Sequence, residues 1–184
     1  EKPEQKSEGP SDEEVRQESS KAAQSAIAAQ NKAKELSQAA AGAGDPEERQ
    51  KLLNEALEKE MESESFGKTA KYLTSGSFQG LVAGGGLGTG TGVALGTITG
   101  SLVGGLTSLA TGGLGAGLGA GVGAMHGPFV NMGELAGEGI RKITGTIPGW
   151  EASEEQQKTL EKMMGQVNEQ ERPSEDDLAA LSSG

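Results

Sequence analysis

The fold of this chain is decided by residues 80–104, which read GLVAGGGLGTGTGVALGTITGSLVG. Glycine returns at every fourth position, and the register already begins at Gly76. Residues four apart lie on one face of a helix, so the repeat predicts a helix with bare backbone along one side. The glycines of this register are Gly76, Gly80, Gly84, Gly88, Gly92, Gly96, Gly100 and Gly104.

The repeat lies in a segment, residues 72–133, that contains no Asp, Glu, Lys or Arg. Each glycine costs an aqueous helix about 1 kcal/mol relative to alanine, whereas hydrocarbon admits only internally bonded helices or closed barrels. A spanning helix needs about 20 residues, so the segment has room for two. We expect helices over residues 78–106 and 109–130, with a break at 107–113. The second helix carries its own register of Gly115, Gly119, Gly123 and Gly127.

The regions on either side are acidic and helix-prone. Residues 1–71 begin with a polar stretch, 1–10, that we expect to be disordered. Ser11 with Glu14 matches a capping box, and Asp45-Pro46 matches a second helix start. Residues 134–184 are expected to hold short helices, one capped at Ser153 and ending near Gly165 and one capped near Ser174, followed by a disordered tail.

Small apolar residues recur at helical spacing in the first region. This pattern predicts a weak, alanine-rich packing face on the first helix and a narrow apolar stripe on the second. The first face consists of Val15, Ala22, Ala26, Ala29, Ala33, Leu36 and Ala40, and the second stripe of Leu53, Leu57 and Met61.

Basic and aromatic residues stand at both borders of the uncharged segment. Basic residues at both ends predict that the segment crosses a membrane an even number of times. The residues expected at the membrane interface are Lys68, Lys71, Tyr72, Arg141, Lys142 and Trp150.

The glycine registers resemble those of glycine-zipper two-helix membrane hairpins, a broad class that includes bacterial envelope proteins and small cristae-organising proteins of mitochondria. The resemblance rests on the glycines within residues 80–104 and 115–127, and it covers the uncharged segment 72–133, about a third of the chain. It implies self-association in the plane of a membrane. The sequence therefore predicts an all-α fold with a central glycine-zipper hairpin between polar, partly disordered helical flanks.

Several functions are disfavoured by composition. A net charge of −11 argues against a nucleic-acid partner. His126 is the sole histidine and cysteine is absent, so we expect no metal site and no cofactor. Gly67-Lys68-Thr69 resembles the end of a phosphate-binding loop, but Glu62 stands where that loop needs glycine. We found no catalytic constellation and predict that the protein is not an enzyme.

The sequence leaves several functions open. The first is a non-enzymatic membrane protein that forms homo-oligomers through its glycine helices and organises or permeabilises the bilayer. An amphitropic form, soluble before it inserts, is included in that prediction. The alternative is a soluble glycine-rich stress, ice-binding or interaction protein, which the run GTGTG at 88–92 favours. A flexible linker is disfavoured because apolar residues separate the glycines. The acidic flanks leave room for a protein partner.

Overall fold

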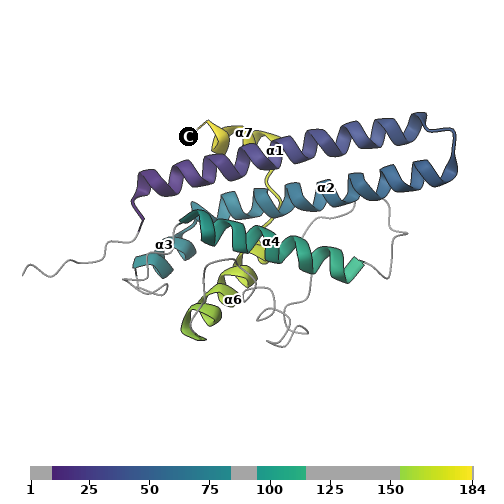
Figure 1. The fold of residues 1–184 in the computed structure, drawn as a ribbon. Helices are drawn as coiled ribbons and strands as arrows, with labels where there is room; N and C mark the ends of the chain where they lie inside the picture. The colour runs from purple at the N-terminus through teal and green to yellow at the C-terminus, as the bar shows by residue number, and fades with distance from the viewer. Residues whose placement is uncertain (1–9, 84–94, 115–153, 184) are drawn as a thin grey trace, which may run out of the picture.

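The computed structural model describes residues 10–83, 95–114 and 154–183, and all its elements in these ranges are helices (Figure 1). The predicted all-α class is therefore confirmed. The helices are α1 (Asp12–Gly42), α2 (Pro46–Leu73), α3 (Gly76–Ala83), α4 (Leu95–Leu114), α6 (Glu154–Glu169) and α7 (Glu175–Ser182).

The helix starts follow the predicted capping chemistry. The Ser11 hydroxyl accepts from the Glu14 amide while the Glu14 carboxylate accepts from the Ser11 amide, which completes a capping box at α1. Asp45 caps α2, with Pro46 in its first turn. Ser174 forms a second capping box at the start of α7. The cap expected at Ser153 lies outside the described residues.

Helices α1 and α2 form a long antiparallel pair (Figure 1). Small buried residues form the seam between them. The Ser19 hydroxyl of α1 donates to the Ala70 carbonyl of α2 at 2.8 Å, and the Ser63 hydroxyl of α2 donates to the Ala26 carbonyl of α1 at 2.7 Å. Each serine lies seven residues before the alanine of its own helix, so the two bonds define one antiparallel register. The buried residues of the predicted α1 face are Val15, Ala22, Ala26, Ala29, Ala33 and Ala40, while Leu36 is half-buried.

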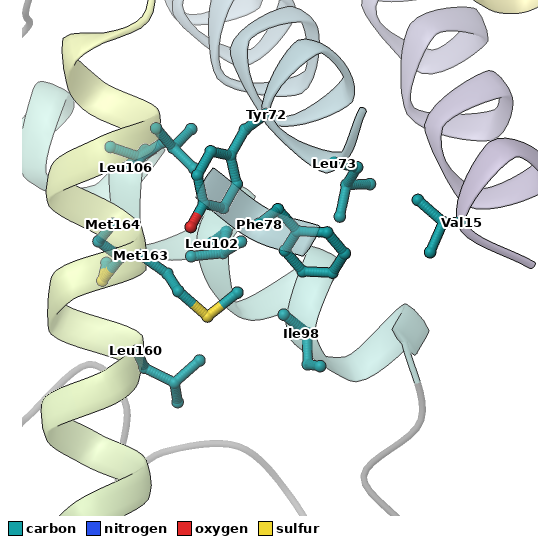
Figure 2. Packing of buried hydrophobic residues seen from close by; sticks show 11 residues of the cluster. Val15, Tyr72, Leu73, Phe78, Ile98, Leu102, Leu106, Leu160, Met163 and Met164 are labelled. Atoms are coloured by element: carbon teal, nitrogen blue, oxygen red, sulfur yellow. The ribbon is translucent and has the colours of Figure 1, made fainter. Parts of the chain in front are cut away.

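Helices α3, α4 and α6 cover one side of this pair. Their apolar side chains meet the ends of α1 and α2 in one cluster, and Phe78 lies edge-on to Tyr72 with ring centroids 5.7 Å apart (Figure 2). The cluster consists of Val15, Tyr72, Leu73, Phe78, Ile98, Leu102, Leu106, Leu160, Met163, Met164 and Val167. Helix α7 packs elsewhere, mainly on α1, where Leu178 joins a smaller cluster with Ala22, Ala23, Ala26 and Ala70.

Two predicted helix ends are wrong. Helix α4 continues through residues 107–113 to Leu114, so the expected break there does not occur. Helix α6 passes through Gly165 to Glu169 because Met163, Met164 and Val167 bury one face across that glycine. In the ranges that the structure describes, no helix combines the length and apolar character required to cross a bilayer. Membrane-type helices are thus unsupported there, and residues 84–94 and 115–130 of the expected hairpin lie outside the described ranges.

Candidate functional site

Helix α4 presents a strip of bare backbone on the outside of the bundle. Gly96, Gly100 and Gly104 are exposed at intervals of four residues. A Cβ added at Gly100 or Gly104 would meet no described atom within 4 Å, and one at Gly96 would lie 3.9 Å from the Glu18 carboxylate. We call Gly96, Gly100 and Gly104 the glycine face of α4.

The opposite side of α4 holds the helix on the bundle. Ile98, Leu102 and Leu106 also recur every four residues, but they are offset from the glycines by two positions and therefore point the other way. All three are buried against α2 and α6 (Figure 2). One α4 face thus builds the core while the other carries almost no side chain.

The remaining predicted packing glycines do not form a described contact. Gly76 and Gly80 lie on α3, are exposed, and would meet no described atom within 4 Å if they carried a Cβ. The others lie outside the described residues: Gly84, Gly88, Gly92, Gly115, Gly119, Gly123 and Gly127. The structure therefore shows which face α4 presents, and no helix among the described residues packs against that face.

Behind α4, the second half of α2 carries a buried polar layer. Helix α2 is in contact with α1, α4 and α6, so even its polar side chains are enclosed. The Thr107 hydroxyl of α4 donates to the Ser65 hydroxyl at 3.1 Å and ties α4 to this layer. The fully buried polar residues of α2 are Ser63, Glu64, Ser65, Lys68 and Thr69.

An ion pair lies at the centre of this layer. The Lys68 ammonium is 3.3 Å from the Glu64 carboxylate one turn away, and both side chains are at most 1% exposed. Lys68 also donates to the backbone carbonyl of Asn168 at 3.2 Å, in the last turn of α6. Burial lowers the pKa of Lys68, the Glu64 carboxylate opposes this shift, and the charge of Arg172 adds to it. The ammonium satisfies a carbonyl at the negative end of the α6 dipole.

Tyr72 makes a second link from α2 to α6. Its hydroxyl donates to the side-chain carbonyl of Gln166, and burial raises the pKa of Tyr72 to about 12. Lys68 and Tyr72 were expected at a membrane interface, yet both are completely buried in this bundle, and Lys71 is half-buried. Three further residues expected there lie outside the described ranges: Arg141, Lys142 and Trp150.

Sequence reasoning missed the polar layer because its local signal is ambiguous. A Glu and a Lys four residues apart are typical of an exposed helix face. Their burial depends on Asn168, which is 100 residues away from Lys68 in the sequence.

The residues of the glycine face and of the polar layer behind α4 are suited to packing between helices. Within the described ranges no group of three His, Cys, Asp or Glu side chains could hold a metal ion. Among the described residues of α4, the exposed ones are Gly96, Gly100 and Gly104, and the helix sequence contains no charged residue. Comparison with known proteins found no matching family model, curated protein or solved structure.

Proposed function

We propose that this protein is a non-enzymatic self-associating protein whose copies meet through the glycine face of α4 and act together on a bilayer, organising or permeabilising it. The observation that carries the proposal is the exposed run Gly96, Gly100 and Gly104 on a helix without charge. Helix α4 is already held in place by its buried face, so a second copy needs to bury only the glycine face.

Bare backbone is a surface for close helix contact. Where glycine repeats every turn, two helices can approach until dispersion contacts and weak Cα–H hydrogen bonds form between their backbones. Glycine has no side chain to order, so these contacts form without the loss of side-chain conformational entropy that long residues would add. Exposed glycines at this spacing therefore favour a helix partner over a small ligand.

The uncharged segment is the feature that favours a bilayer as the target. Residues 72–133 contain no acidic or basic side chain, and α3 and α4 both lie within it. In the bundle, Ile98, Leu102 and Leu106 face the core. A bilayer-bound form would have to release this face from α2 and α6, so we assign the bundle to the form that exists before membrane contact.

The burial of that same face favours a second candidate, a soluble protein that associates only with other proteins. Release of α4 would take Ile98, Leu102 and Leu106 out of the core and break the hydrogen bond between Thr107 and Ser65. In this alternative the bundle stays intact and the glycine face of α4 is used in water.

Single cysteines test the glycine face directly, because the chain contains no cysteine. We expect Gly100→Cys to form disulfide-linked dimers under mild oxidation. The matched control is Gln38→Cys, which places a thiol on an exposed position of α1. Equal cross-linking at both positions, or none at position 100, would show that α4 is not the contact.

Two further measurements separate the candidates. Gly100→Leu with Gly104→Leu has room for its side chains in the bundle and should therefore keep the fold while abolishing dimers. Co-flotation of the full chain with phospholipid vesicles tests the bilayer. Dimers that do not float with the vesicles would exclude the membrane function and favour the soluble candidate. Flotation together with dye leakage from the vesicles would support the membrane function.

A further inference from the structure

Helix α6 covers apolar side chains of both α4 and α2, the two helices on which it mainly packs. One face of α6 is buried in this contact, while Lys158 and Lys162 remain exposed on the other face. Moving α6 outwards would therefore uncover apolar residues of three helices at once. The buried residues of α6 are Leu160, Met163, Met164 and Val167, and they share a cluster with Leu102 and Leu106 of α4 and Tyr72 of α2 (Figure 2).

Two polar contacts from α2 hold the second half of α6. The Lys68 ammonium lies 3.2 Å from the Asn168 carbonyl, and the Tyr72 hydroxyl donates to the side chain of Gln166. Both contacts start from side chains that are completely buried. Residues 170–174 then lead to α7, which packs mainly on α1. The attachment of α6 to the bundle is therefore separate from that of α7.

The ion pair behind α6 makes this attachment depend on charge. The Lys68 ammonium is 3.3 Å from the Glu64 carboxylate, and both side chains are enclosed. Burial lowers the pKa of Lys68, so the enclosed form holds this charge at a cost. A buried charge that loses its counterion strongly destabilises the state that encloses it. The enclosed form therefore requires an ionised Glu64, and a proton on Glu64 disfavours it.

In the described parts of the chain, the neighbouring helices bring little other charge to this pair. Arg172 follows α6, and its charge acts on Lys68 and adds to the need for Glu64 as a counterion. Glu161 lies on α6, and one of its carboxylate oxygens is buried without a hydrogen bond. Helices α3 and α4 contain no charged residue, and the buried residues of α1 and α7 are uncharged. Tyr72 stays neutral in acid because burial raises its pKa to about 12.

We infer that α6 is a lid over the apolar face of α4, and that the uptake of a proton by Glu64 releases this lid. Once Glu64 is neutral, the Lys68 ammonium is better solvated outside the bundle, and separation of α6 from α2 gives it access to water. Such an opening is local, since α7 and the α1–α2 pair keep their own contacts. The inference rests on the proposed function and adds its regulation, because acid would uncover the apolar residues that a bilayer-bound form needs.

Hydrogen exchange of the full chain measures the lid directly. Exchange in residues 154–169, corrected for the intrinsic effect of pH, should become faster below about pH 4.3, where a solvated glutamate binds its proton. One proton taken up on opening raises the open fraction by up to about tenfold per pH unit. Residues 12–42 should keep their protection over the same range. Equal acceleration in both segments would show that acid unfolds the whole bundle, and it would overturn the inference.

Substitutions of the ion pair identify the group that titrates. Glu64→Gln is neutral and similar in size, so α6 should exchange rapidly already at about pH 7 and lose its dependence on pH. Glu64→Leu combined with Lys68→Met removes both charges, and α6 should stay protected in acid. The matched controls Glu161→Gln on α6 and Glu35→Gln on the exposed surface should keep the acid response. Normal protection of α6 in Glu64→Gln would contradict the lid, as would loss of protection in α1.

Flotation with phosphatidylcholine vesicles separates the lid from the proposed function. These vesicles carry no net charge, so binding in acid cannot result from the altered charge of the chain. The unaltered chain should float in acid, and Glu64→Gln should float at about pH 7. Faster exchange of α6 in acid without flotation would leave the lid standing and remove the bilayer from the proposed function. Flotation while α6 stays protected would keep the bilayer and overturn the lid.

Discussion

The ammonium of Lys68 on α2 lies 3.2 Å from the backbone carbonyl of Asn168 in the last turn of α6. A buried lysine therefore serves as the end cap of a helix that follows it by many residues in the chain. Its charge is balanced by Glu64 on its own helix. This relationship makes the attachment of α6 depend on charge as well as on apolar packing.

Removing one partner of this ion pair should destabilise the fold strongly. Lys68→Met leaves the Glu64 carboxylate buried without its counterion, and we expect a loss of about 3–5 kcal/mol in the free energy of unfolding. Glu64→Leu combined with Lys68→Met removes both charges and should recover most of that loss. Urea unfolding measures both effects.

The exposed pair Lys32–Glu35 provides the control for the ion-pair experiment, since both its side chains are more than half accessible. Lys32→Met should change stability by less than about 1 kcal/mol. If Lys68→Met is equally mild, the buried pair contributes no more than an exposed one.

Tyr72 should make stability fall at high pH. Burial raises its pKa from 10.0 to about 12, so the fold favours the neutral phenol. Its contribution is complete below pH 10 and is lost as the pH rises towards 12, by about 2–3 kcal/mol in total. The stability difference between the unaltered chain and Tyr72→Phe should shrink over this range.

The lowered pKa of Lys68 acts in the opposite direction, since its contribution grows as the pH rises towards 10.5. Lys68 is present in both chains of the Tyr72 comparison, so its effect cancels in the difference. A difference that stays constant between pH 9 and pH 12 would show that the phenol titrates normally.

The Ser63 hydroxyl contributes one bond to the α1–α2 seam, and its small size lets the helices pack closely. Ser63→Ala keeps the size and loses the bond to Ala26, so it should cost about 1 kcal/mol. Ser63→Leu inserts a large side chain into a closed seam and should cost about 1–3 kcal/mol or more. Thermal unfolding monitored by helicity distinguishes the two, and equal effects would mean that the seam has spare volume.

Two substitutions of Gly67 should distinguish the effect of helix propensity from the effect of steric contact with α7. A Cβ at this position would lie 3.4 Å from Pro173 and 3.5 Å from Leu178, which is ordinary contact. Gly67→Ala should therefore stabilise the chain, by up to about 1 kcal/mol, because alanine favours helix. Gly67→Leu should instead push α7 away from α2, which faster hydrogen exchange in residues 175–182 would report. Slow exchange in that variant would contradict the contact.

Local signals in the sequence predicted much of the fold. The capping box at Ser11, the Asp45-Pro46 start and the alanine face of α1 act within a few residues, and each appears as predicted. The glycine repeat also predicted that α4 is helical despite its composition. Tertiary packing decided the rest, because a buried face on Met163, Met164 and Val167 carries α6 past a glycine that would end an isolated helix.

The candidate site was predicted only in part. The glycine spacing identified the bare face of α4, since a four-residue repeat requires no tertiary information. Lys68 and Tyr72 were assigned to a membrane interface because they border an uncharged segment, and that pattern also fits residues enclosed by a distant helix. Their partners Asn168 and Gln166 belong to α6, and no local rule connects them.

The α1–α2 connection consists of residues 43–45 only, so it leaves little freedom for one helix to slide along the other. The hydroxyl bonds of Ser19 and Ser63 add a different restriction, because each hydroxyl has to face the backbone of the neighbouring helix. The two serines therefore favour one rotation of each helix about its own axis, much as a single polar residue selects one arrangement of a coiled coil.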